Sequence, residues 1–305
     1  RSLFFAFKNT KGDMIVQIDC DFEDPPELLP EFVKKWEERG HTWVGYDMAG
    51  NHEFDLSKKV KELYINHKNN PIDVVVHFAA IPRVEFSVKY PRLVMNNNIN
   101  STTNILAWAK KEKIPFIYSS SSSVVGNGDG PASPYALSKY VGELETLLYS
   151  KLYGLKTVAL RYFNVYSYDQ VADSDYATVV CNWKKYITNN HNPYITGDGE
   201  QRRDMTHVDD IVSANIFCAE NIEKDELWGQ WYDVGSGENI SLNELKNIVL
   251  DHFPDTQFKY IEPREGDVMF TEADLSKFKK HGWEAKIRLQ DGLREVYGKL
   301  KKELG

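Results

Sequence analysis

The sequence has few cysteines, no long apolar run and no excess of basic residues. Its three cysteines, Cys20, Cys181 and Cys218, form no CxxC pair and show no zinc-ligand spacing. We therefore expect reduced thiols and a cytoplasmic location. We expect neither a membrane span nor a secretory signal, because no apolar stretch approaches the necessary length. The net charge of -8 disfavours nucleic acid and membrane surfaces as partners, since both require basic patches.

Short apolar runs alternate with helical patterns through the first half of the 305 residues. The expected strands are residues 14–19, 41–47, 72–77, 116–119 and 156–162. The expected helices between them are residues 27–40, 56–67, 92–111 and 135–152. Strands that alternate with helices of this length imply βαβ crossovers and a parallel sheet covered on both faces. The predicted fold class is therefore α/β, with a doubly wound, Rossmann-like parallel sheet.

The pattern becomes less regular after Tyr166. We expect helices at 176–189, 242–252 and 289–304, strands at 193–196 and 231–234, and a turn at 197–199. The predicted division is a Rossmann-like domain from 1–165 plus about 204–235, and a smaller mixed α/β substrate region from 166–203 and 236–305. Ligands of open parallel sheets bind beyond the carboxyl ends of the strands. We therefore expect the site between these two regions.

One stretch joins a serine-rich strand end to a tyrosine and a lysine on a helix. Residues 114–139 read IPFIYSSSSSVVGNGDGPASPYALSK. Tyr135 and Lys139 are four residues apart and share one face of the expected helix. A free tyrosine has a pKa of about 10, and a nearby lysine ammonium favours the phenolate. Together with Ser121, the pair suits proton transfer at a sugar hydroxyl beside a redox cofactor.

The YxxxK spacing alone carries little information. The sequence also contains it at Tyr64 with Lys68 and at Tyr297 with Lys301. Those two pairs are interpreted as helix-surface residues. Only Tyr135 follows a strand that ends in serines, which favours it as the catalytic tyrosine.

Motifs of a known family occur in order along the chain: YD at 46–47, FDL at 54–56, HFAA at 77–80, NNNINSTTNIL at 96–106, SSSSVVG at 120–126, SPYALSK at 133–139, LRYFNVYS at 160–167, GDGEQRRDMTHVDD at 197–210, VGSGENIS at 234–241 and PREGDV at 263–268. From about residue 41 onward the chain resembles an extended short-chain dehydrogenase/reductase. The motifs are similar to those of the NAD-dependent epimerase/dehydratase family, of the UDP-glucose 4-epimerase type.

The resemblance implies NAD as the cofactor, bound by the Rossmann-like domain, and no metal. It implies that Asp47 binds the adenosine ribose and that Asp55 and Leu56 flank the adenine. The other residues implied to line NAD are Phe78, Ala79, Ala80, Asn98, Tyr135, Lys139 and Phe163. Those implied to hold the nucleotide diphosphate of the substrate are Asn164, Arg203 and Arg264. Alternative interpretations are a strand-end turn for Asp47, a helix-terminal polar residue for Asn98, and surface charges for both arginines.

The implied reaction is epimerisation of a UDP-hexose at C4, with Ser121, Tyr135 and Lys139 as catalytic residues. Tyr135 would take the proton of the C4 hydroxyl while hydride passes to NAD, and hydride would return to the other face of the keto sugar. Related 4,6-dehydratases carry Thr-Asp-Glu where this chain has Ser121, Ser122 and Ser123, which favours epimerisation. The alternatives are an NAD-dependent sugar-nucleotide reductase or decarboxylase, and a catalytically silent sugar-nucleotide binding protein. The resemblance also implies a homodimer formed through the helices at 92–111 and 135–152.

The chain departs from the family at its first βα turn, where the family has GxxGxxG. The only glycines before Asp47 are Gly12, Gly40 and Gly45. Residues 19–26 read DCDFEDPP instead, and residues 1–38 resemble a fragment of a family 2 glycosyltransferase with a DxD-like motif. Carboxylates repel phosphates, and prolines remove backbone donors. We therefore predict weakened NAD binding.

Overall fold

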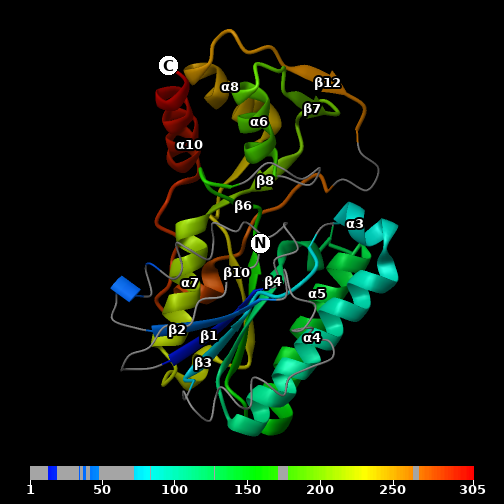
Figure 1. Cartoon of the computed structure of the whole chain (residues 1–305), viewed down its shortest axis with the longest axis vertical. Helices are drawn as coiled ribbons and strands as arrows, with labels where there is room; N and C mark the ends of the chain where they lie inside the picture. The colour runs from blue at the N-terminus through cyan, green and yellow to red at the C-terminus, as the bar shows by residue number, and fades with distance from the viewer. Residues whose placement is uncertain are drawn as a thin grey trace.

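The computed structural model describes residues 13–18, 34, 37–38, 42–47, 72–82, 84–126, 128–170, 178–263 and 268–305. Its centre is a six-stranded parallel sheet with the order β10-β5-β4-β3-β1-β2 (Figure 1). The strands are β1 Asp13–Ile18, β2 Thr42–Asp47, β3 Val74–His77, β4 Phe116–Ser121, β5 Thr157–Tyr162 and β10 Gln230–Val234. The predicted parallel sheet is confirmed, and β4 extends two residues beyond the predicted end, as far as Ser121.

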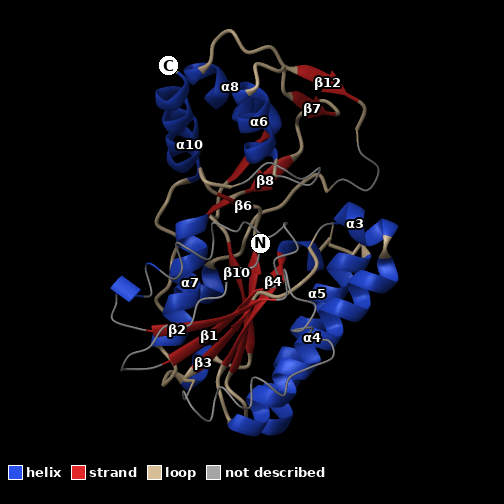
Figure 2. Cartoon of the chain, viewed as in Figure 1, coloured by secondary structure: helices blue, strands red, loops and turns tan. Residues whose placement is uncertain are grey.

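Helices cover both faces of this sheet (Figure 2). On one face lie α4 (Pro91–Glu112) and α5 (Pro134–Tyr153), and on the other lie α7 (Val208–Glu220) and the short α9 (Ser276–Lys279). Trp108 of α4 packs with Phe116 and Val75 on the first face, whereas Ile211 of α7 packs with Val76 on the second. Strands buried on both faces read as continuous apolar runs, as β3 does.

Local sequence signals define α5, which begins close to the predicted catalytic tyrosine. The Ser133 hydroxyl accepts a hydrogen bond from the Ala136 amide at 3.1 Å and caps the helix, while Pro134 occupies its first turn. Gly154, at φ 64°, ends the helix in the left-handed conformation. Gly142 lets α5 approach β4 closely, because a Cβ there would lie 2.3 Å from the Tyr118 hydroxyl. This close packing fixes the height of α5 over the sheet.

A smaller mixed lobe lies beyond the carboxyl ends of the strands (Figure 1). Its helices are α6 (Val179–Thr188), α8 (Leu242–His252) and α10 (Leu289–Leu304), and the last two match the predicted bounds. Its strand pairs are β6 (Val165–Tyr166) with β9 (Thr206–His207), β7 (Tyr194–Thr196) with β12 (Lys259–Ile261), and β8 (Arg202–Asp204) with β11 (Asn239–Ser241). The remaining elements are α3 (Val84–Lys89) and the 3-10 turns η1 (Ser122–Val124) and η2 (Asp225–Leu227).

The sheet brings the predicted strand ends to one edge. Asp47, His77, Ser121 and Tyr162 are the last residues of four parallel strands. The chain order reverses between β1 and β3, which pair directly, with Gln17 opposite His77. The predicted helix at 56–67 lies outside the described residues, as does most of the one at 27–40. No helix in the described part of the chain is long and apolar enough to cross a membrane.

The predicted division into two regions stays a prediction. One observation bears on its detail: Leu275, Phe278 and Trp283 pack in the same core as α7 and β10. The segment around α9 therefore packs on the sheet, whereas the sequence predicts residues 236–305 as part of the substrate region.

Candidate active site

The N-terminal half of α5 lies against the end of β4. Tyr135 is in its first turn and partly exposed, and Lys139, one turn later on the same face, is buried. The Lys139 ammonium donates to the Ser119 carbonyl at 2.8 Å and lies 5.4 Å from the centre of the Tyr118 ring. The strand backbone therefore holds this positive charge on the face of α5 that carries Tyr135.

The serines at the end of β4 have different partners. The Ser119 hydroxyl pairs with the Tyr162 hydroxyl at 3.1 Å, and Ser120 donates to the Glu143 carboxylate at 2.8 Å. Ser121 is partly exposed, and its hydroxyl accepts hydrogen bonds from Ser123 in η1. Among Ser119, Ser120 and Ser121, only Ser121 ends the strand with a hydroxyl that is not committed to the sheet or to α5.

A buried polar network lies behind Lys139. Burial, together with the positive charge of Lys139, lowers the pKa of His77 to about 3, so this imidazole is neutral at physiological pH. His77 Nε2 lies 3.0 Å from the Thr102 hydroxyl, which itself donates to the Asn98 carbonyl at 2.8 Å. Since Thr102 uses its proton on Asn98, it accepts from His77. Lys139 therefore has a neutral histidine, not a second cation, for a neighbour.

Asn98 ties the loop after β3 to α5. Its side-chain oxygen Oδ1 accepts from the Ile81 amide at 2.6 Å, and its side-chain nitrogen Nδ2 donates to the Ile81 carbonyl at 3.0 Å and to the Ser138 hydroxyl at 2.9 Å. Asn98, a predicted cofactor contact, thus holds the segment that contains Phe78, Ala79 and Ala80, and these three residues are buried. Phe163 is buried after β5, where its amide donates to the Val234 carbonyl at 3.1 Å.

Four of the predicted residues are only partly covered by the structure, or not at all. Asp47 ends β2 opposite Ile18, and nothing further is described for its side chain. Asp55, Leu56 and Arg264 lie outside the described residues, as do Tyr64 and Lys68. The third YxxxK pair lies in α10, where Tyr297 is fully buried and donates to the Val180 carbonyl at 3.3 Å. Tyr297 therefore belongs to the core of the smaller lobe, and the interpretation of this pair as helix-surface residues is wrong for the tyrosine.

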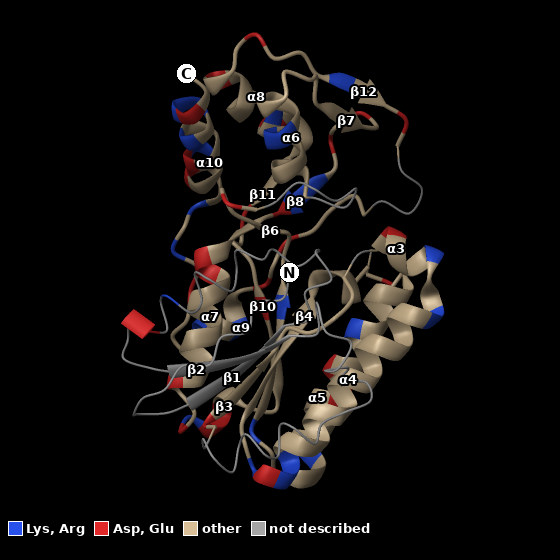
Figure 3. Ribbon diagram, in the orientation of Figure 1, with Lys and Arg blue, Asp and Glu red and all other residues tan. Residues whose placement is uncertain are grey.

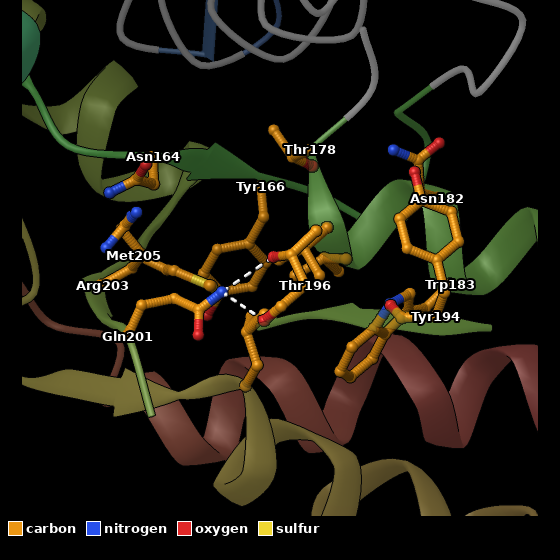
Figure 4. Close-up of a pocket in the computed structure, with 13 residues that line it drawn as sticks. Asn164, Tyr166, Thr178, Asn182, Trp183, Tyr194, Thr196, Gln201, Arg203 and Met205 are labelled. Atoms are coloured by element: carbon orange, nitrogen blue, oxygen red, sulfur yellow. Dashed lines mark hydrogen bonds between the residues drawn. The ribbon is translucent and has the colours of Figure 1, made fainter. Parts of the chain in front are cut away.

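A pocket of about 200 Å³ lies between α6 and β8, and we refer to it as the α6 pocket (Figure 4). Asn164 and Arg203, which the sequence placed at the substrate diphosphate, are both on its wall. The Asn164 side chain donates to the Asp204 carbonyl at 2.6 Å, and its backbone adopts φ 34°. A non-glycine residue with positive φ is unusual and is often found at functional sites. The structure brings these two predicted residues together.

Sequence reasoning named none of the other eleven residues of the α6 pocket as site residues. They are Tyr166, Thr178, Val179, Val180, Asn182, Trp183, Tyr194, Thr196, Gln201, Met205 and Leu242. Gln201 is buried and donates to the Thr196 carbonyl at 3.0 Å and to its hydroxyl at 2.8 Å, which closes one wall (Figure 4). The position of Gln201 in the GDGEQRRD motif could have identified it as a site residue. For Trp183, the sequence offers no such signal beyond its place on an expected helix.

The chain combines a doubly wound parallel sheet, a serine at the end of β4, and a tyrosine and a lysine on the helix that follows. This combination is the arrangement of the extended short-chain dehydrogenases and reductases. The model of the NAD dependent epimerase/dehydratase family matches residues 31–235. The chain belongs to this family, whose cofactor is NAD. The match begins at residue 31, and the resemblance of residues 1–38 to a glycosyltransferase stays a prediction.

Similar proteins carry names that specify different sugars. A putative UDP-glucose 4-epimerase of Methanocaldococcus jannaschii is 34% identical over 81% of this chain and 82% of its own length. A UDP-glucuronate 4-epimerase of Thermodesulfobacterium geofontis is 31% identical over 80% of this chain and 75% of its own. The solved UDP-N-acetylglucosamine 4-epimerase of Methanobrevibacter ruminantium superposes with a TM-score of 0.83 at 28% identity, covering 96% of this chain and 100% of its own.

Proposed function

We propose that the chain is an NAD-dependent nucleotide-sugar epimerase that inverts C4 of a UDP-hexose. The observation that carries this proposal is the position of Ser121, Tyr135 and Lys139 at the end of β4 and the start of α5. The names of the three relatives support the choice, because they agree on UDP and on C4 and differ only in the sugar. The particular hexose is left open for that reason.

Each catalytic residue has a role that follows from its surroundings. Tyr135 accepts the proton of the C4 hydroxyl as a phenolate and later returns it. Lys139, held by the Ser119 carbonyl at 2.8 Å, supplies the positive charge that favours the phenolate. Ser121 donates a hydrogen bond to the sugar oxygen. When bound, NAD supplies the redox chemistry at C4.

Asn164 and Arg203 are proposed to hold the diphosphate of the substrate from the wall of the α6 pocket. The guanidinium suits a diphosphate, because it offers several donors and a fixed positive charge. Arg264 and the adenine-side residues Asp47, Asp55 and Leu56 remain proposals from the family motifs. The same holds for the NAD contacts of Phe78, Ala79, Ala80, Asn98 and Phe163.

The residues of this chain fit one end of NAD better than the other. At the catalytic end, the buried Lys139 ammonium and the Tyr135 hydroxyl are the donors that a ribose and a reacting sugar need. At the phosphate end, β1 is followed in the sequence by Asp19, Asp21 and two prolines where the family has glycines. We therefore propose that NAD binds weakly, with the catalytic end carrying most of the affinity.

The test is UDP-glucose to UDP-galactose conversion by the purified chain across a titration of added NAD. We expect turnover that rises with added NAD, and little NAD carried through purification. Stoichiometric bound NAD in the purified protein would contradict the weakened binding but not the epimerase. Absence of turnover of several UDP-hexoses at saturating NAD would contradict the epimerase and favour a silent sugar-nucleotide binding protein, the alternative that the missing glycines support.

We also propose a cytoplasmic homodimer that pairs through α4 and α5. Leu144, Leu148 and Leu152 form an exposed stripe on α5 at a spacing of four residues. The chain of α4 has no charged residue between Arg92 and Lys110 (Figure 3). Exposed apolar surface of this kind favours a protein interface. Light scattering should give the mass of a dimer, and Leu148→Glu should give a monomer.

Cys181 and Cys218 are both free, in keeping with a reducing compartment.

A further inference from the structure

The hydroxyl oxygen of Ser121 accepts two hydrogen bonds from the turn that follows it. Ser123 in η1 donates its hydroxyl to Ser121 Oγ at 2.9 Å, and its backbone amide lies 3.2 Å from the same oxygen. A serine hydroxyl has one proton to donate and two lone pairs with which to accept. Both acceptor positions of Ser121 are therefore occupied by Ser123, and its proton is left for a partner on the open side.

Two contacts from one residue are more than a cap of the 3-10 turn requires. The Ser121 side chain caps η1 when its oxygen accepts the Ser123 backbone amide, and this contact alone is sufficient for the cap. The hydroxyl contact is the additional one, and it is the shorter of the two. It exists because residue 123 carries a hydroxyl, so this feature depends on the side chain and not on the backbone.

We propose that Ser123 is a positioning residue that makes Ser121 an obligate hydrogen-bond donor. This inference rests on the proposed epimerase function and extends it. With both lone pairs engaged, Ser121 cannot accept the proton of the C4 hydroxyl, so Tyr135 alone receives it. Ser121 then donates to the sugar oxygen both when C4 carries a hydroxyl and when it carries a ketone. A hydroxyl oriented in advance loses less free energy when it forms that bond.

The kinetic test compares Ser123→Ala with Ser123→Thr, which restores the hydroxyl, and with Ser122→Ala as the control for the same turn. We expect Ser123→Ala to lower kcat by about three- to tenfold, the effect of one neutral hydrogen bond, with KM nearly unchanged. Ser123→Thr should recover most of the loss, and Ser122→Ala should resemble the wild type. A rise in KM at constant kcat would overturn the proposal, because it would place Ser123 in contact with the sugar.

The double variant Ser121→Ala with Ser123→Ala distinguishes positioning from general damage. If Ser123 acts through Ser121, the double variant should lose no more activity than Ser121→Ala alone. If the activity losses of the two single variants multiply in the double variant, Ser123 acts independently of Ser121, which overturns the proposal.

A second measurement does not depend on turnover. Neutron structures of the wild type and of Ser123→Ala should show the Ser121 hydroxyl proton on the open side in the first and in more than one direction in the second. An unchanged proton direction in the variant would overturn the positioning role, whether or not the chain is an epimerase. Absence of turnover in the wild type, by contrast, would count against the epimerase proposal alone.

Discussion

The proposed acid–base residues and the α6 pocket are assembled in different ways. Ser121, Tyr135 and Lys139 lie on one continuous segment, residues 116–153, which we refer to as the acid–base segment. It comprises β4, η1 and α5, and its elements pack directly on one another. The α6 pocket combines residues from four parts of the chain: 164–166, 178–183, 194–205 and 242. The two meet only because β4 and β5 end at the same edge of the sheet.

This difference has consequences for how each part responds to mutation. In the acid–base segment, helix periodicity places Tyr135 and Lys139 on one face whatever the rest of the chain does. In the α6 pocket, the position of Arg203 depends on the pairing of β8 with β11, a contact between distant residues. We therefore expect chemistry to depend on single atoms of the acid–base segment, and binding to depend on the α6 pocket.

The largest effect is expected for Tyr135→Phe, with Tyr297→Phe as the matched control. Removing the phenolic oxygen, which as a phenolate would accept the C4 proton, should lower kcat by at least about 100-fold, without a change in thermal stability. Tyr297→Phe removes only a 3.3 Å hydrogen bond to the Val180 carbonyl and should cost about 1 kcal/mol of stability at unchanged kcat. Steady-state kinetics and thermal melts measure both. Intact turnover in Tyr135→Phe would contradict the catalytic assignment.

The next effect is expected at neighbouring arginines of β8. Arg203 lines the α6 pocket, whereas Arg202 bonds to Glu244 of α8 at 2.8 Å. Arg203→Ala should raise KM for the UDP-sugar by about tenfold or more, because a charge-assisted contact to the diphosphate is lost. Arg202→Ala should leave KM unchanged and cost less than about 1 kcal/mol of stability, as expected of a partly exposed ion pair. Equal KM values for the two variants would remove Arg203 from the proposed substrate contacts.

A smaller effect, on stability, separates two helical glycines. A Cβ at Gly142 would lie 2.3 Å from the Tyr118 hydroxyl, whereas a Cβ at Gly298 of α10 has its nearest neighbour, His252 Nε2, at 3.4 Å. Gly142→Ala should therefore lower the free energy of unfolding by about 1–3 kcal/mol, because α5 must move away from β4. Gly298→Ala should be neutral or stabilise the protein by up to about 1 kcal/mol through helix propensity. Urea denaturation tests both, and an unchanged midpoint for Gly142→Ala would contradict the close packing.

The smallest effects are expected at two helix caps. Ser133 caps α5 and Ser241 caps α8, the latter within a reciprocal capping box with Glu244. Either serine-to-alanine change should cost about 1 kcal/mol of stability. Only Ser133→Ala should also lower kcat, since the first turn of α5 carries Tyr135. If Ser241→Ala lowered kcat as much, the two parts of the molecule would be more strongly coupled than their packing suggests.

Local patterns in the sequence were sufficient for the acid–base segment and for much of the sheet. The five strands predicted in the first half of the chain and the one predicted at 231–234 all lie in the six-stranded sheet, whereas the one predicted at 193–196 pairs with β12. Apolar runs that alternate with helices favour a buried parallel sheet. The bounds of α8 and α10 also agree with the prediction. α7 was missed although Asp209 and Asp210 in its first turn were available as a start signal.

The α6 pocket could not be predicted from spacing. Trp183, Gln201 and Leu242 approach one another only after β7, β8 and α8 have packed together. Nothing in the sequence around each residue encodes that contact, since it depends on tertiary packing. Asn164 and Arg203 were found because family motifs mark them, and the structure then placed them on one wall.

The pairing of β7 with β12 also bears on the order in which the protein takes shape during synthesis. β4, α5 and β5 are consecutive in the chain and pack together, so they can collapse as soon as residue 162 has been made. β7 must wait for residues 259–261, and β8 for residues 239–241, before either has its strand partner. A nascent chain would therefore already hold its proposed catalytic side chains on one packed segment before the α6 pocket has formed.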